Sequence, residues 1–238
     1  MPVMQYELGN YSAAEAPVDA RAAFITRTYL HLLGAIVLFC VLEATWFASG
    51  LAVPMLNLLV TGGRFGWLLV LGGFMGVSML AERWANSDAS PAIQYAGLGF
   101  YVLAESLIFV PMIAFAIAAT GDLSLLGEAG LITLVLFGGL TGVVFLTRKD
   151  FSFLRGILLF AGIAGLVFIA ASAIFGFSLG LVFSWAMLVL ACGYILYHTS
   201  NVMLHYRPDQ HVAASLALFA SVALLFWYVL RILLSRRD

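Results

Sequence analysis

The sequence predicts an all-α protein, a bundle of seven transmembrane helices in which the last helix is central. Of its 238 residues, 63% are hydrophobic and only 10% are charged, whereas soluble domains are about 45–50% apolar and about 25% charged. Seven apolar stretches are each long enough to cross the hydrocarbon core as a helix. Residues 157–161 are apolar throughout and lack the alternation of a transmembrane β-strand. This composition excludes a soluble enzyme and a disordered chain.

The chain divides into a polar tail and one membrane domain. Residues 1–26 carry prolines and acidic side chains and are expected to be a flexible tail. Residues 27–238 form the membrane domain. Ser90 and Pro91, with Asp88 before them, are typical of a helix start. The expected spans are Thr28–Ser49, Phe65–Ala81, Ala92–Ala119, Leu131–Thr147, Leu154–Phe175, Leu179–Tyr197 and Val212–Leu234.

The distribution of positive charge predicts a cytoplasmic N-terminus. With seven spans, the tail and every second connection share one side of the membrane, and that side holds Arg21, Arg27, Arg83, Arg148, Lys149, Arg155 and Arg207. The connections on the other side hold only Arg64. Because positive connections stay in the cytoplasm, we expect an integral membrane protein with its N-terminus inside, in the plasma (inner) membrane of a prokaryote. Three basic residues at the C-terminal end, Arg231, Arg236 and Arg237, oppose this orientation. A re-entrant last segment therefore stays an alternative.

Glu105 is the carboxyl group placed deepest in the predicted membrane domain. It follows Pro91 by 14 residues and has apolar neighbours on both sides, which places it about 20 Å from the start of its helix. Pro111 lacks an N–H, so the carbonyl of Leu107 loses its helical partner. Two interpretations stay open: a cation or proton site, or a protonated side chain hydrogen-bonded to a neighbouring helix.

Two further charged side chains have alternative interpretations. Glu43 lies near the end of the first span and either snorkels to the interface or has a role inside the bundle. Arg83 ends the second span beside Trp84. It is either an interfacial anchor or a counter-charge that reaches inward to a buried acid.

The last two spans form a predicted hairpin around Pro208 and Asp209. His198 precedes this turn by about 15 Å and Ser221 follows it by about 18 Å, so we expect the two at nearly equal depth. Histidine changes charge between pH 5 and 8 and is a candidate switch. Small residues spaced by four, Ala213, Ala217 and Ser221, favour close helix packing.

The sequence offers little for an enzyme, a cofactor or a nucleic acid. The net charge is −1, so there is no basic surface for a phosphate backbone. Gly176–Gly180 fits the G-x-S-x-G pattern, but it joins two spans rather than a strand and a helix. The only lysine, Lys149, lies in a connection, which excludes a retinal pigment. No metal-ligand or phosphate-loop spacing occurs, and we expect no catalytic residue and no cofactor.

Several segments, taken in order, resemble the Bax inhibitor-1 (transmembrane Bax inhibitor motif) family. Residues 147–154, T-R-K-D-F-S-F-L, are similar to its charged connection, and residues 194–198, Y-I-L-Y-H, are similar to the end of its sixth span. Residues 214–219 and 225–233 resemble its closing span, and residues 27–30 fit its opening. The resemblance covers about residues 20–234.

The resemblance implies a seven-helix bundle with a central last helix and, for some members, a pH-sensitive calcium leak. In those members two membrane aspartates in the last two spans share a proton, and an arginine at the end of span two pairs with them. Here these positions hold His198, Ser221 and Arg83. The acidic pair is therefore absent, and its mechanism does not transfer to this chain.

Two functions follow as expectations. In the first, the protein is a proton-gated cation (calcium) leak in which Glu105 supplies charge and His198 is the switch. In the second, it conducts nothing and binds other membrane proteins, such as a membrane protease or stress-response complex. Helix docking would then use Gly72 and Gly76 on the second span and the small residues of the seventh.

Overall fold

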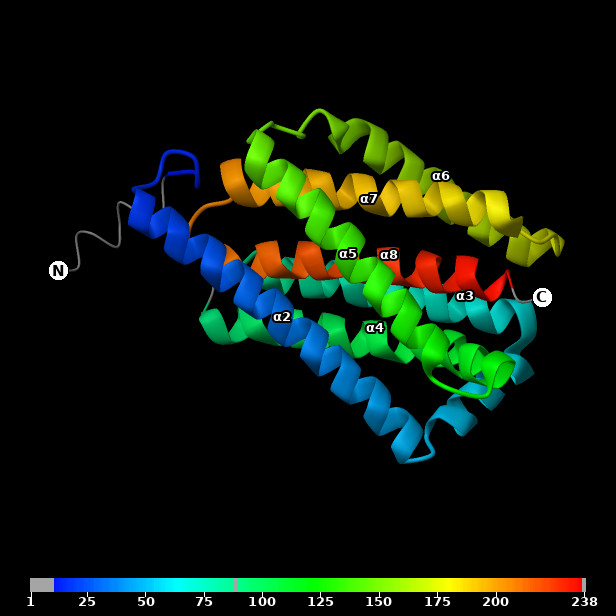
Figure 1. Ribbon diagram of the computed structural model, residues 1–238. Helices are drawn as coiled ribbons and strands as arrows, with labels where there is room; N and C mark the ends of the chain where they lie inside the picture. The colour runs from blue at the N-terminus through cyan, green and yellow to red at the C-terminus, as the bar shows by residue number, and fades with distance from the viewer. Residues whose placement is uncertain (1–10, 88–89, 237–238) are drawn as a thin grey trace.

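The structure is a bundle of long helices without strands in its described part (Figure 1). This computed structural model describes residues 11–87 and 90–236, without the side chains of residues 59, 64 and 65. Its helices are α2 (Val18–Ala48), α3 (Ala52–Ala85), α4 (Pro91–Thr120), α5 (Ser124–Thr147), α6 (Leu154–Phe175), α7 (Gly180–Leu204) and α8 (His211–Leu234). Seven helical segments are long and apolar enough to cross a membrane, which confirms the predicted fold class.

The N-terminal helix is longer than the predicted span. α2 begins at Val18, inside the segment 1–26 that we expected to be a flexible tail, so residues 18–26 are helical. Before it, Ala13 is buried and its N–H donates to the carbonyl of Tyr206, 2.8 Å away. Residues 1–10 lie outside the described part of the chain. The tail boundary was wrong because the first turns of α2 are too polar to stand out as a span.

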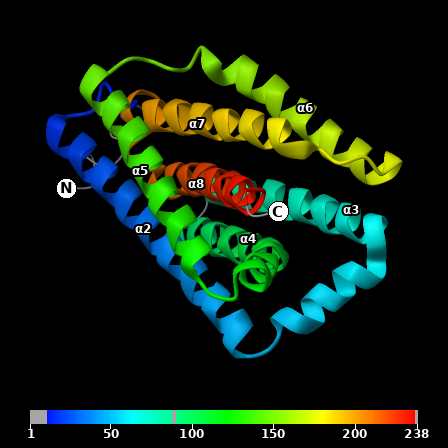
Figure 2. The same ribbon diagram turned by 45° about the vertical axis from the view of Figure 1, so that its right-hand side comes forward.

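The second helix is bent at a glycine. Gly63 has φ 54° and ψ −146°, outside the helical region, and separates an initial apolar piece from the membrane span Gly66–Ala85. A side chain would strain this backbone, which glycine adopts freely. The bend is visible at the start of α3 (Figure 2). α4 begins as predicted with Ser90 at the N-cap and Pro91 in the first turn, and Asp88 lies outside the described residues.

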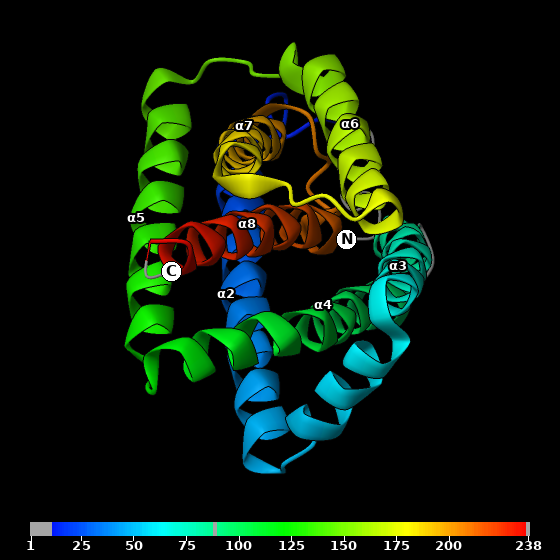
Figure 3. The same cartoon turned by 90° about the vertical axis from the view of Figure 1, so that its right-hand side faces the viewer.

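The last helix is the centre of the bundle (Figure 3). α8 packs against α2, α3, α4, α5 and α7, and most of its residues are buried. Its small residues Ala213 and Ser221 are each 3% exposed. The small residues of the seventh span therefore pack inside the bundle. The expectation that they form a docking surface for a partner is wrong.

The helix connections alternate between two ends of the bundle. The start of α2 and the α5–α6 and α7–α8 connections lie at one end, and the C-terminus lies at the other (Figures 1 and 2). Helix α8 is 24 residues long and apolar enough to cross a membrane, which favours a full span over a re-entrant last segment. The basic connections do share an end, while the side chain of Arg64 and residue Arg237 lie outside the described part. Which end faces the cytoplasm stays a prediction.

Helices α3 and α4 approach each other closely at Gly97. A Cβ atom there would come 2.7 Å from the carbonyl oxygen of Ala81 and 2.9 Å from the backbone nitrogen of Ala85. Both alanines are buried, at 0% and 2% exposed. In a bilayer, small residues that let backbones approach are a main source of helix association.

Replacing Gly97 with alanine is expected to destabilise the bundle by about 1–3 kcal/mol, because the added methyl group collides with rigid backbone. Gly99→Ala is the matched control, since a Cβ at Gly99 meets nothing within 4 Å. Alanine there should be neutral or stabilising by roughly 0.5–1 kcal/mol. Unfolding of both variants in mixed detergent micelles measures the difference. Equal stability of the two variants would contradict the close contact.

The charged connection between α5 and α6 is fixed to the end of α7. Asp150 accepts hydrogen bonds from the N–H of Ser152 at 2.8 Å and from Nε2 of His205 at 3.1 Å. The N–H of Phe151 donates to the hydroxyl of Ser200 at 2.9 Å. The Ser152 N–H, with a smaller contribution from His205, lowers the pKa of Asp150 below its usual 3.8, against the opposing effect of desolvation.

This lowered pKa predicts a pH dependence with a definite sign. A carboxyl whose pKa falls on folding stabilises the folded state above its unfolded pKa, and the contribution disappears as pH falls through the folded value. The stability advantage of the natural chain over Asp150→Asn should therefore be constant at neutral pH. It should decline below about pH 4, near the usual pKa of 3.8. Melting temperatures of both proteins from pH 3 to 7 measure it, and an advantage that grows on acidification would be incompatible.

Candidate functional site

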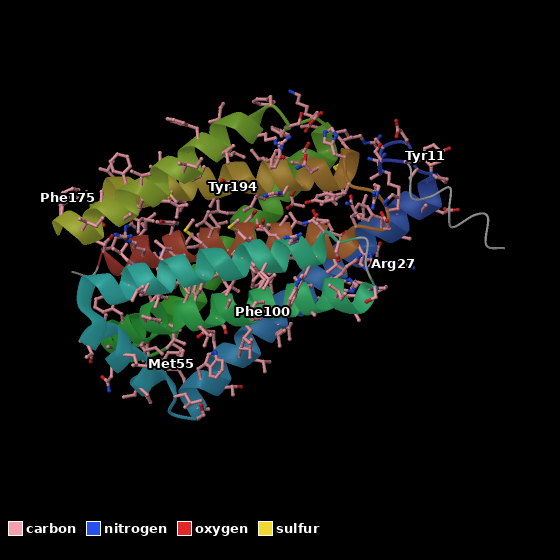
Figure 4. The ribbon with its side chains drawn as sticks, turned by 180° about the vertical axis from the view of Figure 1, so that it is seen from behind. Tyr11, Arg27, Met55, Phe100, Phe175 and Tyr194 are labelled. Atoms are coloured by element: carbon pink, nitrogen blue, oxygen red, sulfur yellow. The ribbon has the colours of Figure 1, made fainter. Side chains whose placement is uncertain are left out.

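A cavity of about 740 Å³ lies between α3, α4, α6, α7 and α8. Its walls are mainly apolar and aromatic, with Trp67 and Phe74 from α3, Phe109 from α4 and Trp227 from α8. Tyr194 of α7 also lines it, and its hydroxyl donates to the carbonyl of Leu158 on α6 at 3.0 Å. Figure 4 shows Tyr194 on α7 between the levels of Arg27 and Phe175, in the middle part of the bundle.

The rotation of α4 places Glu105 in this cavity. Tyr101, Glu105 and Phe109 are spaced by four residues, so they share one helix face, and all three line the cavity. The next residue, Ser106, faces α2, where its hydroxyl accepts a 3.1 Å hydrogen bond from Nε1 of Trp46. Gly97 packs against α3, and Ser106 bonds to Trp46 on α2. Together these two contacts set the rotation of α4 that turns Glu105 towards the cavity.

Glu105 is a buried carboxyl with an unused oxygen. It is 8% exposed, and its Oε2 atom is buried without a hydrogen-bond partner. The Tyr101 hydroxyl, one turn away, interacts with the carboxyl. Ser78 and Glu82 of α3 line the same cavity, and the Ser78 hydroxyl is buried and unpartnered as well. A buried polar group without a partner is costly, so this arrangement is a candidate binding site.

His198 lies on α7 outside the cavity lining. Its ring stacks on Tyr194 with centroids 5.9 Å apart and contacts the edge of Tyr197 at 5.0 Å. Its Nδ1 atom is buried and has no hydrogen-bond partner. Tyr194, on which His198 stacks, lines the cavity with Glu105, whereas His198 does not. Its role as a pH switch stays a prediction.

Ser221 and Arg83 do not join Glu105 among the described residues that line the cavity. The Ser221 hydroxyl donates to the carbonyl of Ala217 at 2.9 Å within α8, so its hydrogen bond is made on its own helix. Arg83 is exposed near the end of α3. This position fits the interfacial anchor and not the inward counter-charge; the neighbouring Glu82 is the charged residue that reaches the cavity.

Glu43 does not snorkel, contrary to the first of its two interpretations. It is 7% exposed, and both carboxyl oxygens are buried without a partner. Its helix face is the one on which Leu32 and Ala35 are buried in the core. Pro111 lies inside α4, which continues through it to Thr120. Neither Glu43 nor Pro111 lines the cavity in the described structure.

Sequence reasoning missed a second polar cluster at the α2, α4 and α8 interface. The rings of His31 and His211 lie 5.0 Å apart, and His31 stacks on Tyr95 at 5.3 Å. The Tyr95 hydroxyl and Nε2 of His211 are 3.2 Å apart. No sequence signal connects residues so distant along the chain. In the described residues, no three acidic, histidine or cysteine side chains form a metal-binding group here or in the cavity.

The comparisons with known proteins agree with this architecture. The family described as "Inhibitor of apoptosis-promoting Bax1" matches residues 21–238. Escherichia coli YccA, named a modulator of FtsH protease in strain K12 and an inner membrane protein in strain CFT073, is 27% identical over 81% of this chain and 89% of its own. Bax inhibitor 1 of Schizosaccharomyces pombe is 26% identical, over 92% of this chain and 79% of its own.

A viral protein extends this range of relatives. The Golgi anti-apoptotic protein of Vaccinia virus is 27% identical over 94% of this chain and 91% of its own. The family match spans nearly the whole chain, including all the helices that surround the cavity. The chain therefore belongs to the Bax inhibitor-1 family of integral membrane proteins.

Proposed function

We propose that this protein is a membrane-embedded modulator of a membrane-anchored protease complex and that it has no enzymatic activity of its own. The similarity to YccA, named a modulator of FtsH protease, supports the partner class. Among the described residues, no three acidic, histidine or cysteine side chains form a metal-binding group. Regulation would therefore act through helix-to-helix contact, with the N-terminus and the basic end of the bundle in the cytoplasm.

The observation that carries this proposal is an open glycine face on α3. Gly72 and Gly76 are exposed and spaced by four residues, and a Cβ atom at either position would meet nothing within 4 Å. Leu69 on the same face is 77% exposed. Phe74 and Ser78, which line the cavity, lie on the other side of the helix, while Met75 and Met79 line the edge of the cavity beside the glycine face.

Small residues at this spacing let a second transmembrane helix approach closely. α5 carries a similar pair, Gly138 and Gly142, but Gly142 is half-buried, so the α3 face is the more open of the two. The small residues of α8 are enclosed. The partner would be a transmembrane anchor of the protease, packed against the α3 face.

Gly76→Leu is expected to reduce association with an FtsH-type protease at least fivefold, because the larger side chain separates the two helices. The control is Gly156→Leu on α6, another exposed glycine with open space around it. Cross-linking in membranes, followed by quantification of the co-purified protease, gives the association. Degradation of a membrane substrate by the protease in proteoliposomes gives the functional effect.

Two results would contradict the proposal. One is an absence of association between the natural chain and the protease in these membranes. The other is an equal loss of association in Gly76→Leu and Gly156→Leu, which would show that the α3 face has no particular role.

A second function, a pH-sensitive cation (calcium) leak, is favoured by one observation: two carboxyl side chains, Glu105 and Glu82, line a cavity inside the bundle. In this version Glu105 attracts the cation. Protonated His198, on α7, repels it through its positive charge.

This version predicts that calcium flux into dye-loaded liposomes is lower where His198 is protonated than where it is neutral, in a scan from pH 4 to 8. Glu105→Gln should lower the flux at least tenfold, and His198→Ala should remove its pH dependence. Glu43→Gln is the control, since Glu43 is equally buried but does not line the cavity. Flux that is absent at every pH, or unchanged by the first two substitutions, would exclude the leak.

A further inference from the structure

The cavity combines an aromatic wall with an isolated carboxyl group. Trp67 and Trp227 stack with centroids 6.3 Å apart, and Phe109 meets the ring of Trp227 edge-on at 5.0 Å. Phe74 and Tyr101 form a further pair at 5.8 Å. The faces of aromatic rings carry negative electrostatic potential and attract cations within about 6 Å. All five of these rings line the cavity.

The polar side of the cavity is acidic. Glu105 presents a buried oxygen, Oε2, that has no partner in the described structure. Glu82 adds a second carboxyl towards the end of α3, where it is exposed. The opposite charge, Arg231, lines the cavity from the last turn of α8, the far end of the bundle. The carboxyl oxygens of the described lining therefore lie apart from its positive side chain.

Exposed side chains of α3 line the cavity where α3 packs against α6. Met79 is 71% exposed and Met75 is 42% exposed, and both line the cavity beside Ile169 of α6. Flexible methionine side chains at an opening adapt to ligands of different shape. A volume of about 740 Å³ lies in the range of roughly 300–1,000 Å³ that is typical of small-molecule sites.

These features distinguish between classes of ligand. A bare metal ion would leave the aromatic wall unused, and the described residues contain no group of three side chains that would hold it. A fatty acid or a lipid phosphate would find no positive partner beside Glu105 and Glu82, because Arg231 lines the cavity at the other end of the bundle. An organic ammonium donates charge-assisted hydrogen bonds to a carboxylate, and its apolar body packs against aromatic rings.

We propose that this cavity is a binding site for a lipophilic organic ammonium. The ammonium group binds Oε2 of Glu105, and the apolar body lies against Trp67, Trp227 and Phe109. The ligand enters from the membrane between α3 and α6. This site goes beyond the proposed function, because its occupancy requires neither the protease nor ion flux.

The test measures binding of radiolabelled 4-phenylbutylamine to the full chain in lipid nanodiscs by equilibrium dialysis, with empty nanodiscs subtracted. The matched compound is 4-phenylbutyrate, which has the same apolar body and the opposite charge. We expect saturable binding of one amine per chain and no saturable binding of the acid. Glu105→Gln should raise the Kd at least tenfold, whereas Glu43→Gln, a buried glutamate outside the cavity, should change it less than twofold.

A second variant tests the location of the site independently of Glu105. Ile169→Trp fills the mouth of the cavity and should abolish amine binding while the melting temperature stays that of the natural chain. The proposal is overturned if amine and acid bind equally, if Glu43→Gln and Glu105→Gln have equal effects, or if a folded Ile169→Trp binds normally. If Glu105→Gln does not fold, the comparison of amine with acid binding and the binding by Ile169→Trp decide whether the proposal holds. Variants such as Gly76→Leu that lose protease association should not change the Kd of the amine, so the two proposals can fail separately.

Discussion

The backbone contact of α3 with α4 at Gly97 determines where the polar groups of this bundle lie. Lipid tails are as apolar as the helices, so association in the membrane depends on packing and hydrogen bonds rather than on the hydrophobic effect. Gly97 brings α4 against Ala81 and Ala85 with no room for a methyl group. From that contact, α4 continues along α3 and presents Tyr101 and Glu105 to the cavity that the two helices share.

The second constraint is the enclosure of α8. Because five neighbouring helices cover it, its serines make their hydrogen bonds within the bundle: Ser221 to its own helix, and Ser215 also to the carbonyl of Thr28 on α2 at 2.9 Å. The interior around α8 is thus largely closed, whereas α3 has two accessible sides. One side lines the cavity through Phe74 and Ser78, and the adjoining face exposes Gly72 and Gly76, with Met79 between them at the edge of the cavity. A ligand inside and a partner helix outside would therefore act on the same element.

The sequence predicts the fold well because spans are set by the run length of apolar residues. α6 begins and ends where predicted, at Leu154 and Phe175, while α2 extends into polar residues from Val18 that no hydropathy argument includes. The candidate site was harder to predict. Glu105 could be identified from the sequence because a carboxyl group in the middle of a span is costly. Its neighbours depend on how each helix is rotated about its axis, and residue spacing along the chain does not predict that rotation. His198 and Ser221 have similar predicted depths, yet one packs on Tyr194 and the other bonds within α8.

The claim that the polar cavity lies between α3 and α4, and not between the last two helices, is tested most directly by cysteine accessibility. In a chain with Cys40 and Cys192 replaced, Ser172→Cys and Ser221→Cys are matched substitutions, because each hydroxyl donates to a carbonyl of its own helix; Ser172 lines the cavity and Ser221 is 3% exposed in the core. A small ammonium-bearing thiol reagent should modify Ser172→Cys at least tenfold faster than Ser221→Cys. Modification of Ser221→Cys at an equal or higher rate would contradict the account.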